Sequence, residues 1–365
     1  MAIGAEDAGR RDWLRLVSIP GIGGESQRKL LKSFGLPEAV FSASEAELAT
    51  VIGHDLATKL FQHNANKEID ADLAWAAESG NRIITLADSD YPKALLDQPD
   101  PPVLLYAKGR VELLNRPTIA VVGSRNATKQ GEANAEAFSE ALASAGITIV
   151  SGLALGIDAA AHRGGLKSTA STIAVIGTGP DRIYPARNAD LARRIADGGL
   201  IISEFAVGTP PLANNFPRRN RIIAGLGMGC LVVEAAQRSG SLITARLAAE
   251  MGRDVFAIPG SIHSPLSRGC HSLIRQGAKL VESAQDILEE LRWESTLIAA
   301  KSPDSIVDPA QAALLMAMGH ETCSVDNLVD ASGLTADSVL AILMALELNG
   351  RVAQLPGGLY QQLNN

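Results

Sequence analysis

The feature that most constrains this chain is a regular alternation of short apolar runs with helical stretches, which starts at Pro117 and continues to Val281. Continuous apolar runs are typical of strands that helices cover on both faces of a parallel sheet. The runs predict strands at 119–122, 147–150, 172–176, 200–202, 230–233, 255–258 and 279–281. The stretches between them predict helices at 129–145, 157–166, 189–196, 219–226 and 242–251. This order predicts a doubly wound α/β domain.

A helical module precedes this domain and a strand-forming segment connects the two. Residues 8–72 contain Ile19-Pro-Gly-Ile-Gly23, a turn similar to that of a helix-hairpin-helix, where backbone N–H groups approach a phosphate. Residues 6–70 hold 8 basic and 10 acidic residues. Two interpretations therefore stay open: contact with DNA, and a plain interhelical turn in a packing or dimerisation module. Short strands at 82–86 and 103–106 surround a proline-rich turn and indicate either a domain boundary or an edge extension of the next sheet.

A small module follows a linker at 294–309. Helices are expected at 310–318, 325–331 and 335–348, with a hairpin around 356–358, which is the order of a winged helix-turn-helix. Between Asp308 and the end, Arg351 is the only basic residue against six acidic ones. Phosphate neutralisation by this module is therefore poorly supported, and we expect it to serve protein interaction or packing. The predicted domains are 8–72, 80–292 and 308–365.

Charge is distributed unevenly along the chain. The net charge is −7, yet residues 116–279 hold 18 Lys and Arg against 11 Asp and Glu, which leaves −14 for the remainder. A polyanion would therefore bind the middle of the chain.

Cysteines and apolar segments indicate the compartment. Cys230, Cys270 and Cys323 are odd in number and form no C-x-x-C pair, so neither a disulfide framework nor a metal site is expected. The first ten residues lack an apolar signal region, and charges interrupt every apolar run well before 18 residues. We therefore expect a cytoplasmic protein with no membrane span.

Small and hydroxylated residues follow the predicted strands, where ligands bind in folds of this class. Gly123-Ser-Arg125 follows the first strand and reads as an anion-binding turn, and Ser151-Gly152 follows the second. The sequence has no G-x-G-x-x-G after the first strand and no G-x-x-x-x-G-K-[ST], which argues against an NAD enzyme and a P-loop NTPase. No cofactor is expected.

A basic and aromatic cluster is the more specific signal. Phe216, Arg218, Arg219, Asn220 and Arg221 start a predicted helix, which suits phosphate contact and base stacking on single-stranded nucleic acid. The alternative is a solvated helix end, or arginines held in ion pairs with Glu204 and Glu234. A second anion-type site is Arg238-Ser-Gly-Ser-Leu-Ile-Thr244, where Ser241 is expected to be an N-cap whose free amides face the same crevice. An ordinary cap without a ligand is equally compatible.

Candidates for catalysis are weak. Asp158 and His162 lie four residues apart and could act as an acid/base pair, but a capping Asp that orients a partly buried His is the favoured interpretation. Glu204 and Glu234 each follow a strand and more often anchor an arginine or a backbone amide. Cys270 and His271 are adjacent in sequence, so their side chains diverge. We assign no catalytic residue.

Motifs spread through the central domain in one order resemble those of the DNA-processing protein A (DprA/Smf) family. They are Gly123-Ser-Arg125, Ser151-Gly-Leu-Ala-Leu-Gly-Ile-Asp158, His162, Gly177-Thr-Gly179, Tyr184-Pro-Ala-Arg-Asn188, Ser203-Glu204, Phe216-Pro-Arg-Arg-Asn-Arg-Ile-Ile-Ala224, Ser239-Gly-Ser241 with Thr244-Ala245, Gly252-Arg-Asp-Val-Phe-Ala-Ile-Pro-Gly260 and Leu273-Ile-Arg-Gln-Gly-Ala278. Their shared order is more specific than any single motif. The resemblance implies an extended Rossmann-like, mostly parallel sheet with a helix-hairpin-helix or SAM-like module before it and a winged helix after it.

The resemblance also implies a non-catalytic role in natural transformation and recombination. The protein would bind single-stranded DNA in a basic pocket, form a homodimer and help load the RecA recombinase. The phosphate-cradling turn falls on Gly123, Ser124 and Arg125, and Gly177-Thr-Gly179 replaces the frequent Gly-Cys-Gly of the family, which speaks against thiol chemistry. The predicted DNA-binding residues are Gly123, Ser124, Arg125, Ser151, Gly152, Phe216, Arg218, Arg219, Asn220, Arg221, Ser239, Gly240 and Ser241.

An enzyme of similar fold is the alternative, a nucleotide phosphoribohydrolase of the lysine-decarboxylase-like type. It should show Pro-Gly-Gly-x-Gly-Thr-x-x-Glu near the fifth strand. Residues 234–250 contain Arg238-Ser-Gly-Ser241 in its place, so this alternative ranks below DNA binding.

Overall fold

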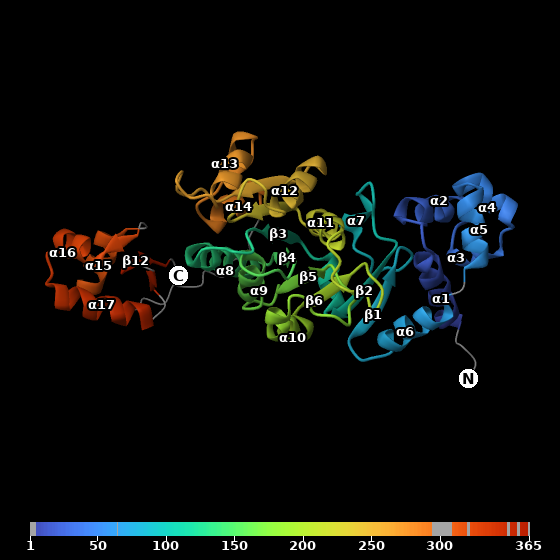
Figure 1. The fold of residues 1–365 in the computed structure, drawn as a ribbon, viewed down its shortest axis with the longest axis horizontal. Helices are drawn as coiled ribbons and strands as arrows, with labels where there is room; N and C mark the ends of the chain where they lie inside the picture. Colours follow the sequence, from blue (N-terminus) through green and yellow to red (C-terminus); the bar gives the residue numbers. More distant parts are fainter. Residues whose placement is uncertain are drawn as a thin grey trace.

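The computed structural model describes residues 5–63, 65–293, 309–319, 322–348, 351–355 and 358–363. A nine-stranded sheet forms the centre, with helices packed on it, an N-terminal group of helices at its β1 edge and a three-stranded C-terminal unit (Figure 1). The fold class predicted from the sequence is confirmed: the sheet is mostly parallel and helices flank it.

Six helices form the N-terminal region. They are α1 (Ala5–Ser18), α2 (Gly24–Phe34), α3 (Pro37–Ser42), α4 (Glu45–Ile52), α5 (His54–Gln62) and α6 (Asn66–Ala76). Local sequence sets their limits: a reciprocal capping box between Ser44 and Glu47 starts α4, and Gly35 and Gly53 end α2 and α4 at positive φ. Leu16, Leu30 and their neighbours form a core of their own among α1 to α5.

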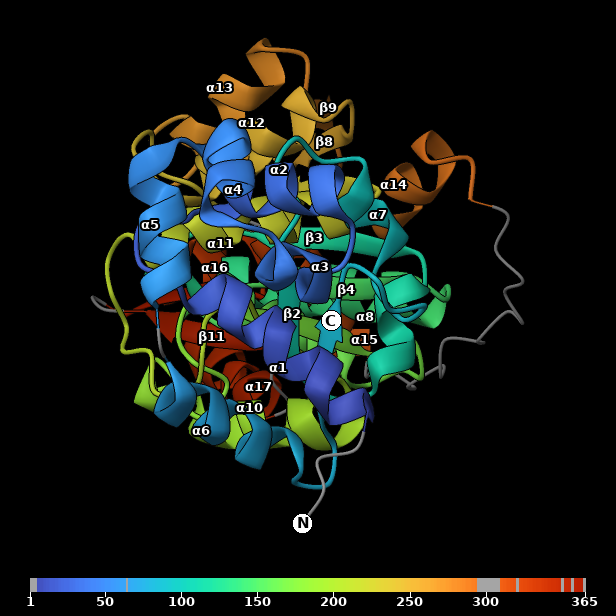
Figure 2. The ribbon, with the colours of Figure 1, turned by 90° about the vertical axis from the view of Figure 1, so that its right-hand side faces the viewer.

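A second apolar cluster joins these helices to the sheet. Trp13 and Trp75 from α1 and α6 pack with Ile83 and Tyr106 of the first two strands, where the rings of Trp75 and Tyr106 lie 5.7 Å apart, edge to face. Seen from the N-terminal side, α1 lies in front of β2 (Leu104–Gly109) (Figure 2). The N-terminal module is therefore docked on the antiparallel end of the sheet.

The strand order of the central sheet is β1-β2-β6-β5-β4-β3-β7-β8-β9. The strands are β1 (Asn81–Thr85), β2, β3 (Thr118–Val122), β4 (Thr148–Ser151), β5 (Thr172–Ile176), β6 (Leu200–Ser203), β7 (Gly229–Val232), β8 (Asp254–Ala257) and β9 (Lys279–Leu280). Strands β3 to β9 are parallel to one another, whereas β1 pairs antiparallel with β2, and β2 antiparallel with β6. The expected edge extension at residues 82–106 is thus present.

The remaining helices of the central domain connect these strands. They are α7 (Lys93–Leu96), α8 (Lys129–Ser144), α9 (Ile157–Gly165), α10 (Ala189–Gly198), α11 (Asn215–Leu226), α12 (Ser241–Glu250), α13 (Arg268–Arg275) and α14 (Ala284–Glu290), with 3-10 turns η1 (Val111–Asn115) and η2 (Ala186–Asn188). Helix α11 starts four residues before the expected 219. Pro217 fits inside its first turn because backbone N–H groups there have no helical partner.

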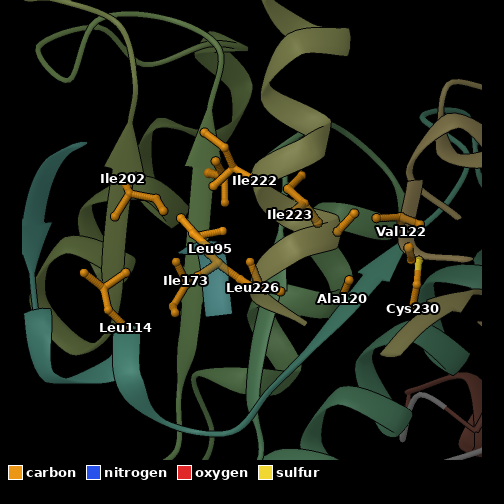
Figure 3. Packing of buried hydrophobic residues seen from close by; sticks show 14 of the residues in the cluster. Leu95, Leu114, Ala120, Val122, Ile173, Ile202, Ile222, Ile223, Leu226 and Cys230 are labelled. Atoms are coloured by element: carbon orange, nitrogen blue, oxygen red, sulfur yellow. The ribbon is translucent and has the colours of Figure 1, made fainter. Parts of the chain in front are cut away.

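The two faces of the sheet bury separate apolar clusters, because successive strand residues point to opposite sides. On β3, Ala120 and Val122 face the cluster that includes Ile222 and Ile223 of α11 (Figure 3). Ile119 and Val121 face the cluster formed with α8, α9 and α14. Helix α11 is therefore fixed over the carboxyl half of the strands by its own buried isoleucines.

The C-terminal unit contains α15 (Pro309–Met318), β10 (Cys323–Ser324), α16 (Val325–Ser332), α17 (Ala336–Leu348), β11 (Val352–Leu355) and β12 (Leu359–Gln362). Its strands pair antiparallel in the order β10-β12-β11, and Leu314, Leu328, Val339 and Leu343 share one core. Gly333, at a φ of 68°, makes the sharp turn between α16 and α17. The predicted winged helix-turn-helix is confirmed, while Pro356 and Gly357 of the hairpin lie outside the described residues.

The described residues show neither a membrane-spanning helix nor a cluster of metal-ligating side chains. No single helix there has both the length and the apolar composition to cross a bilayer; α16 and α17 meet these limits only as a pair bent by 110°. The same residues contain no group of three or more His, Cys, Asp or Glu side chains placed to hold a metal ion.

Candidate nucleic-acid interface

The candidate site lies where the strand order of the sheet reverses direction. Strand β3 has β4 on one side and β7 on the other, so the loops that leave their carboxyl ends diverge and open a crevice. A pocket of about 490 Å³ occupies this position. It is lined by Val122, Gly123, Ser124, Arg125, Asn126, Ala154, Asp158, Phe216, Arg219, Asn220, Ile223, Ala236, Arg238, Ser239, Gly240, Ser241 and Thr244. The sheet topology thus brings together loops that are far apart in sequence.

The turn at 123–125 forms one wall of this pocket and is held from two sides. The backbone N–H of Ser124 donates to the Glu234 carbonyl at 2.7 Å, and its carbonyl accepts from the Ile157 N–H at 3.2 Å. The Ser124 hydroxyl accepts from the Asn126 N–H at 3.2 Å. Arg125 is exposed and, within the described part of the chain, forms no ion pair, so its guanidinium is available to an anion.

Two glycines allow this wall to come close to its neighbours. A Cβ at Gly123 would lie 2.5 Å from Cγ1 of Ile157 and 2.9 Å from the Glu234 carbonyl oxygen. Gly156 has a φ of 71°, and a Cβ there would overlap the Ser124 carbonyl oxygen and lie 2.8 Å from that of Arg125. Close backbone packing, rather than chain flexibility, explains glycine at both positions.

Helix α11 forms the opposite wall, and its period divides the arginine cluster between two faces. Phe216, Arg219, Asn220 and Ile223 recur at three- and four-residue intervals and line the pocket. Arg218 lies on another face and does not line it. The predicted cluster of guanidiniums is therefore split by helical geometry.

Arg219 lies deep in the pocket, with 4% of its surface exposed. One of its Nη atoms donates to the Val175 carbonyl, whereas its Nε has no hydrogen-bond partner in the described structure. Burial lowers the pKa of Arg219 to about 10, against the opposing attraction of the Asp158 carboxylate. Arg219 is thus a cation at the base of the pocket and part of its internal framework.

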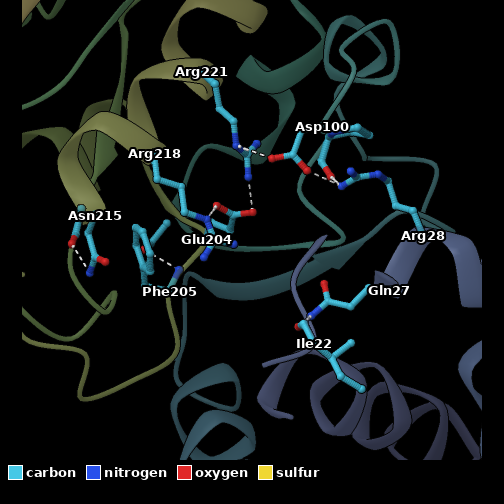
Figure 4. A network of polar contacts seen from close by, with 12 residues as sticks. Ile22, Gln27, Arg28, Asp100, Glu204, Phe205, Asn215, Arg218 and Arg221 are labelled. Carbon is cyan, nitrogen blue, oxygen red and sulfur yellow. Dashed lines mark hydrogen bonds and ion pairs between the residues drawn. The ribbon is translucent and has the colours of Figure 1, made fainter. Parts of the chain in front are cut away.

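Arg218 and Arg221 belong to a different network, and this corrects their expected place among the pocket residues. Both pair with Glu204, with Nε of Arg218 at 3.1 Å, and Arg221 also reaches Asp100 at 3.2 Å (Figure 4). Asp100 pairs in turn with Arg28 of α2, which donates to the Pro101 carbonyl at 3.0 Å. The interpretation that arginines are held by Glu204 is therefore correct for these two. The network ties α11 to the N-terminal module.

Ser151 and Gly152 support the pocket from below and do not line it. Ser151 is fully buried and donates its hydroxyl to the Val121 carbonyl at 2.6 Å. Gly152 leaves the space that the guanidinium of Arg219 fills, because a Cβ there would overlap that group. The structure therefore places both residues behind the pocket lining, and their part in DNA binding stays a prediction.

The serines after β7 complete the rim. Helix α12 begins at Ser241, so Gly240 and not Ser241 is the N-cap, and the expected role of Ser241 is wrong by one position. The Ser239 hydroxyl accepts from the Ser241 N–H at 3.3 Å and lies 2.7 Å from the Ser241 hydroxyl. Arg238, exposed in the same loop, heads the predicted second anion-type site but was left out of the predicted DNA-binding residues. The structure places it on the rim of the pocket.

Asp158 and His162 do not form a pair. The Asp158 carboxylate accepts from the Ala154 N–H at 3.3 Å, and burial raises its pKa while Arg219 opposes the rise. His162, fully buried, accepts from the Leu153 N–H at Nε2, so its proton is on Nδ1, which donates to Thr172 Oγ1 at 2.7 Å. The two side chains therefore shape the loop after β4. The expected capping Asp that orients His162 is wrong, because Gly156 is the N-cap of α9 and His162 contacts Leu153 and Thr172 instead.

This arrangement of His162 predicts acid sensitivity. Burial and the nearby Arg219 lower the pKa of His162 to about 3, from an ordinary value of 6.5. The unfolded chain therefore takes up the proton first, and stability falls as the pH drops from about 6.5 towards 3. His162→Gln should reduce the loss of unfolding free energy between about pH 7 and pH 4.5 in urea titrations. Exposed His263→Gln is the control, and an unchanged pH slope in His162→Gln would refute this assignment.

The other suspected chemical groups have structural partners. Glu234 accepts from the Thr128 N–H at 2.9 Å and its hydroxyl at 2.6 Å, which holds the residue that caps α8. It pairs with no arginine in the described structure, so of its two expected partners, an arginine or a backbone amide, it holds the amide. Burial raises the pKa of the Cys270 thiol to about 12, and His271 contacts the Gly260 carbonyl at 3.0 Å. None of these groups faces the pocket.

Comparisons with known proteins agree with this architecture. Residues 82–292 match the family described as DNA recombination-mediator protein A, and residues 299–358 match the DprA winged helix domain. Protein Smf of Escherichia coli (strain K12) is 40% identical over 95% of this chain and 94% of its own length. DNA processing protein DprA of Streptococcus pneumoniae is 52% identical over 57% of this chain and 74% of its own.

Solved structures of related proteins show the same fold. The X-ray structure of DNA processing protein A from Streptococcus pneumoniae aligns with a TM-score of 0.69 at 40% identity, over 76% of this chain and 97% of that one. A structure of DNA processing protein A from Helicobacter pylori, described for its single-stranded DNA binding mode, aligns with a TM-score of 0.53 at 31% identity. The alignment covers 58% of this chain and 97% of that one. The chain belongs to the DNA recombination-mediator protein A (DprA/Smf) family of DNA-processing proteins.

Proposed function

We propose that this chain binds single-stranded DNA through the pocket between β3 and α11, and that it takes part in DNA uptake and recombination without catalysing a reaction. The observation that carries the proposal is a crevice at the sheet reversal that brings together Arg125, Arg219 and Arg238 with a partly exposed Phe216. Guanidiniums beside an aromatic ring match a DNA backbone with an unstacked base. The relative from Helicobacter pylori is described as binding single-stranded DNA, which supports the proposal.

The backbone of the pocket adds to its affinity for anions. Neither the Arg125 N–H nor the Gly240 N–H has a hydrogen-bond partner among the described residues, and Gly240 stands at the start of the ten-residue helix α12. Free amides and a helix N-terminus favour a phosphate. We propose Gly123, Ser124, Arg125, Phe216, Asn220, Ser239, Gly240 and Ser241 as its direct contacts, with Arg219 as the buried cation behind them.

The experiment that tests this function compares single-stranded with duplex DNA at two salt concentrations by fluorescence anisotropy. We expect preference for the single strand and an affinity that falls with added salt, because the arginines displace counterions from the phosphates. Equal affinity for both forms, or none for either, would reject the proposal.

The winged helix is proposed to contribute little to this affinity. From Asp308 onward the sequence contains one arginine and six acidic residues. Deleting residues 309–365 should change the dissociation constant for oligo-dT by no more than about twofold, since little phosphate charge is neutralised there. A large loss in an anisotropy titration of the shortened chain would contradict this.

We further propose that the protein is a homodimer and that it helps to load the RecA recombinase onto the bound strand, in a cytoplasmic setting. These assignments rest on membership of a recombination-mediator family. Light scattering at several protein concentrations tests the dimer. Strand-exchange assays with RecA, in which this chain relieves inhibition by single-strand-binding protein, test the loading.

The nucleotide phosphoribohydrolase alternative is not favoured. Glu234, which would have to serve that chemistry, is instead engaged with Thr128 at the start of α8. Nucleotide hydrolysis by the purified protein that disappears in Glu234→Gln would restore the alternative.

A further inference from the structure

We propose that Tyr184 and Phe216 together form a stacking platform for a nucleobase next to the phosphate-binding pocket. This inference rests on the proposed function and adds Tyr184 to Phe216 as a second ring for the base. The two ring centroids lie 5.6 Å apart with the planes inclined by 45°. Tyr184 is 47% exposed, so its ring is open to a base from the solvent side.

The platform is continuous with the cationic wall of the pocket. The Arg125 guanidinium lies 5.8 Å from the centre of the Phe216 ring, within the range of a cation–π contact. Phe216 itself lines the pocket, whereas Tyr184 does not. A strand whose phosphate is held by Arg125 would therefore pass its adjacent base over Phe216 and onto Tyr184.

The backbone at Gly177 holds the Phe216 ring in place. The ring packs on the backbone of Gly177, where a Cβ would lie 3.0 Å from Cδ1 of the ring. The Gly177 carbonyl also accepts from the Asn215 side chain at 3.1 Å. A ring fixed in this way loses little conformational entropy when a base stacks on it.

Tyr184 stands on a loop that is anchored at both ends. At the start, Thr178 donates its hydroxyl to the Arg182 carbonyl at 2.8 Å, and the Gly208 N–H donates to Asp181 at 2.8 Å. At the end, buried Asn188 donates its amide to the carbonyls of Leu153 and Ala154, at 2.9 and 3.1 Å. Ala154 lines the pocket, so the loop that carries Tyr184 is built onto the pocket wall.

A nucleobase is the occupant that the surroundings favour. The neighbouring charge is positive, from Arg125, and the described ion pairs include none that neutralises it. Stacking is tolerant of sequence because every base has a π-face, so such a platform accepts any of the bases. An apolar protein segment would leave that guanidinium without an anion.

The test compares two oligomers of equal length and phosphate number, oligo-dT and one composed of abasic sites, by fluorescence anisotropy with the full chain. Tyr184→Ala should weaken binding of oligo-dT about tenfold and leave binding of the abasic strand unchanged, because only the base contact is lost. Tyr184→Phe should bind oligo-dT as the unchanged protein does. Phe61→Ala, which removes a 59% exposed phenylalanine of α5, is the matched control and should change the binding of neither oligomer.

A spectroscopic readout strengthens the assignment. Tyr184→Trp should show indole fluorescence that is quenched by oligo-dT and not by the abasic strand, above the background of the three native tryptophans. Equal losses for both oligomers in Tyr184→Ala, or no loss for either, would overturn the platform.

The two proposals fail in different ways. If Arg125→Ala weakens binding of both oligomers while Tyr184→Ala changes their two affinities equally or not at all, the pocket is supported and the platform is rejected. If the unchanged protein binds neither oligomer, both are rejected.

Discussion

Arg125→Ala is expected to weaken oligo-dT binding by about ten- to a hundredfold, the largest effect on affinity of any single exposed side chain in the pocket. The reason is that a charge-assisted hydrogen bond contributes about 1.5–3 kcal/mol and Arg125 is committed to no carboxylate among the described residues. The slope of log affinity against log salt should become shallower by about 0.7, the change expected for one phosphate contact on a single strand. Anisotropy titrations at several salt concentrations measure both quantities.

The control for Arg125 is Arg194→Ala, an exposed arginine of α10 that does not line the pocket. It removes the same formal charge, so any effect of net charge alone appears in both variants. Arg219→Ala is a weaker test than the sequence suggested, because it also leaves the buried Asp158 carboxylate without its nearest cation. Unchanged affinity and salt slope in Arg125→Ala would remove the turn at 123–125 from the site.

Gly156→Ala is expected to lower the free energy of unfolding by about 2–5 kcal/mol. A side chain at a φ of 71° costs about 1–2 kcal/mol, and the added methyl overlaps carbonyl oxygens of the Ser124–Arg125 turn, which contributes about 1–3 kcal/mol more. Because these oxygens belong to backbone, the methyl can be accommodated only if the turn moves. DNA affinity should therefore fall as well, even where the variant remains folded.

Gly146→Ala separates the two contributions. Gly146 also has a positive φ, 93°, but nothing lies within 4 Å of a Cβ placed there. The free energy of unfolding of Gly146→Ala should be lower by about 1–2 kcal/mol, and this variant should bind oligo-dT as the unchanged protein does. Urea unfolding gives the stabilities and anisotropy gives the affinities. Equal destabilisation of the two variants would show that the contact with the Ser124–Arg125 turn has no energetic role.

Much of the fold was available from the sequence because local patterns determine it. Continuous apolar runs such as 172–176 specify strands buried on both faces, and the observed β5 has those limits. The winged helix followed from three short helices and a glycine turn at Gly333. The domain limits proposed for the central and flanking modules remain predictions.

The candidate site was predicted less completely. Motif order placed Gly123, Ser124 and Arg125 correctly at the carboxyl end of β3, since that position depends only on where an apolar run stops. The arginines of 218–221 are adjacent in sequence but diverge around α11, and only the position of Glu204 and Asp100 shows which of them is already paired. Buried partners of this kind come from other strands and loops.

By itself, the sequence determined the order of strands and helices, the concentration of positive charge in the central domain and the identity of the turn after β3, because each depends on residues close together in the chain. The tertiary structure alone decided that β3 lies between β4 and β7, that Arg219 is buried while Arg125 is exposed, and that Tyr184 meets Phe216. These relations join segments far apart in sequence. They depend on which strands pair and on which segment packs against each helix face, and residues close together in the chain specify neither.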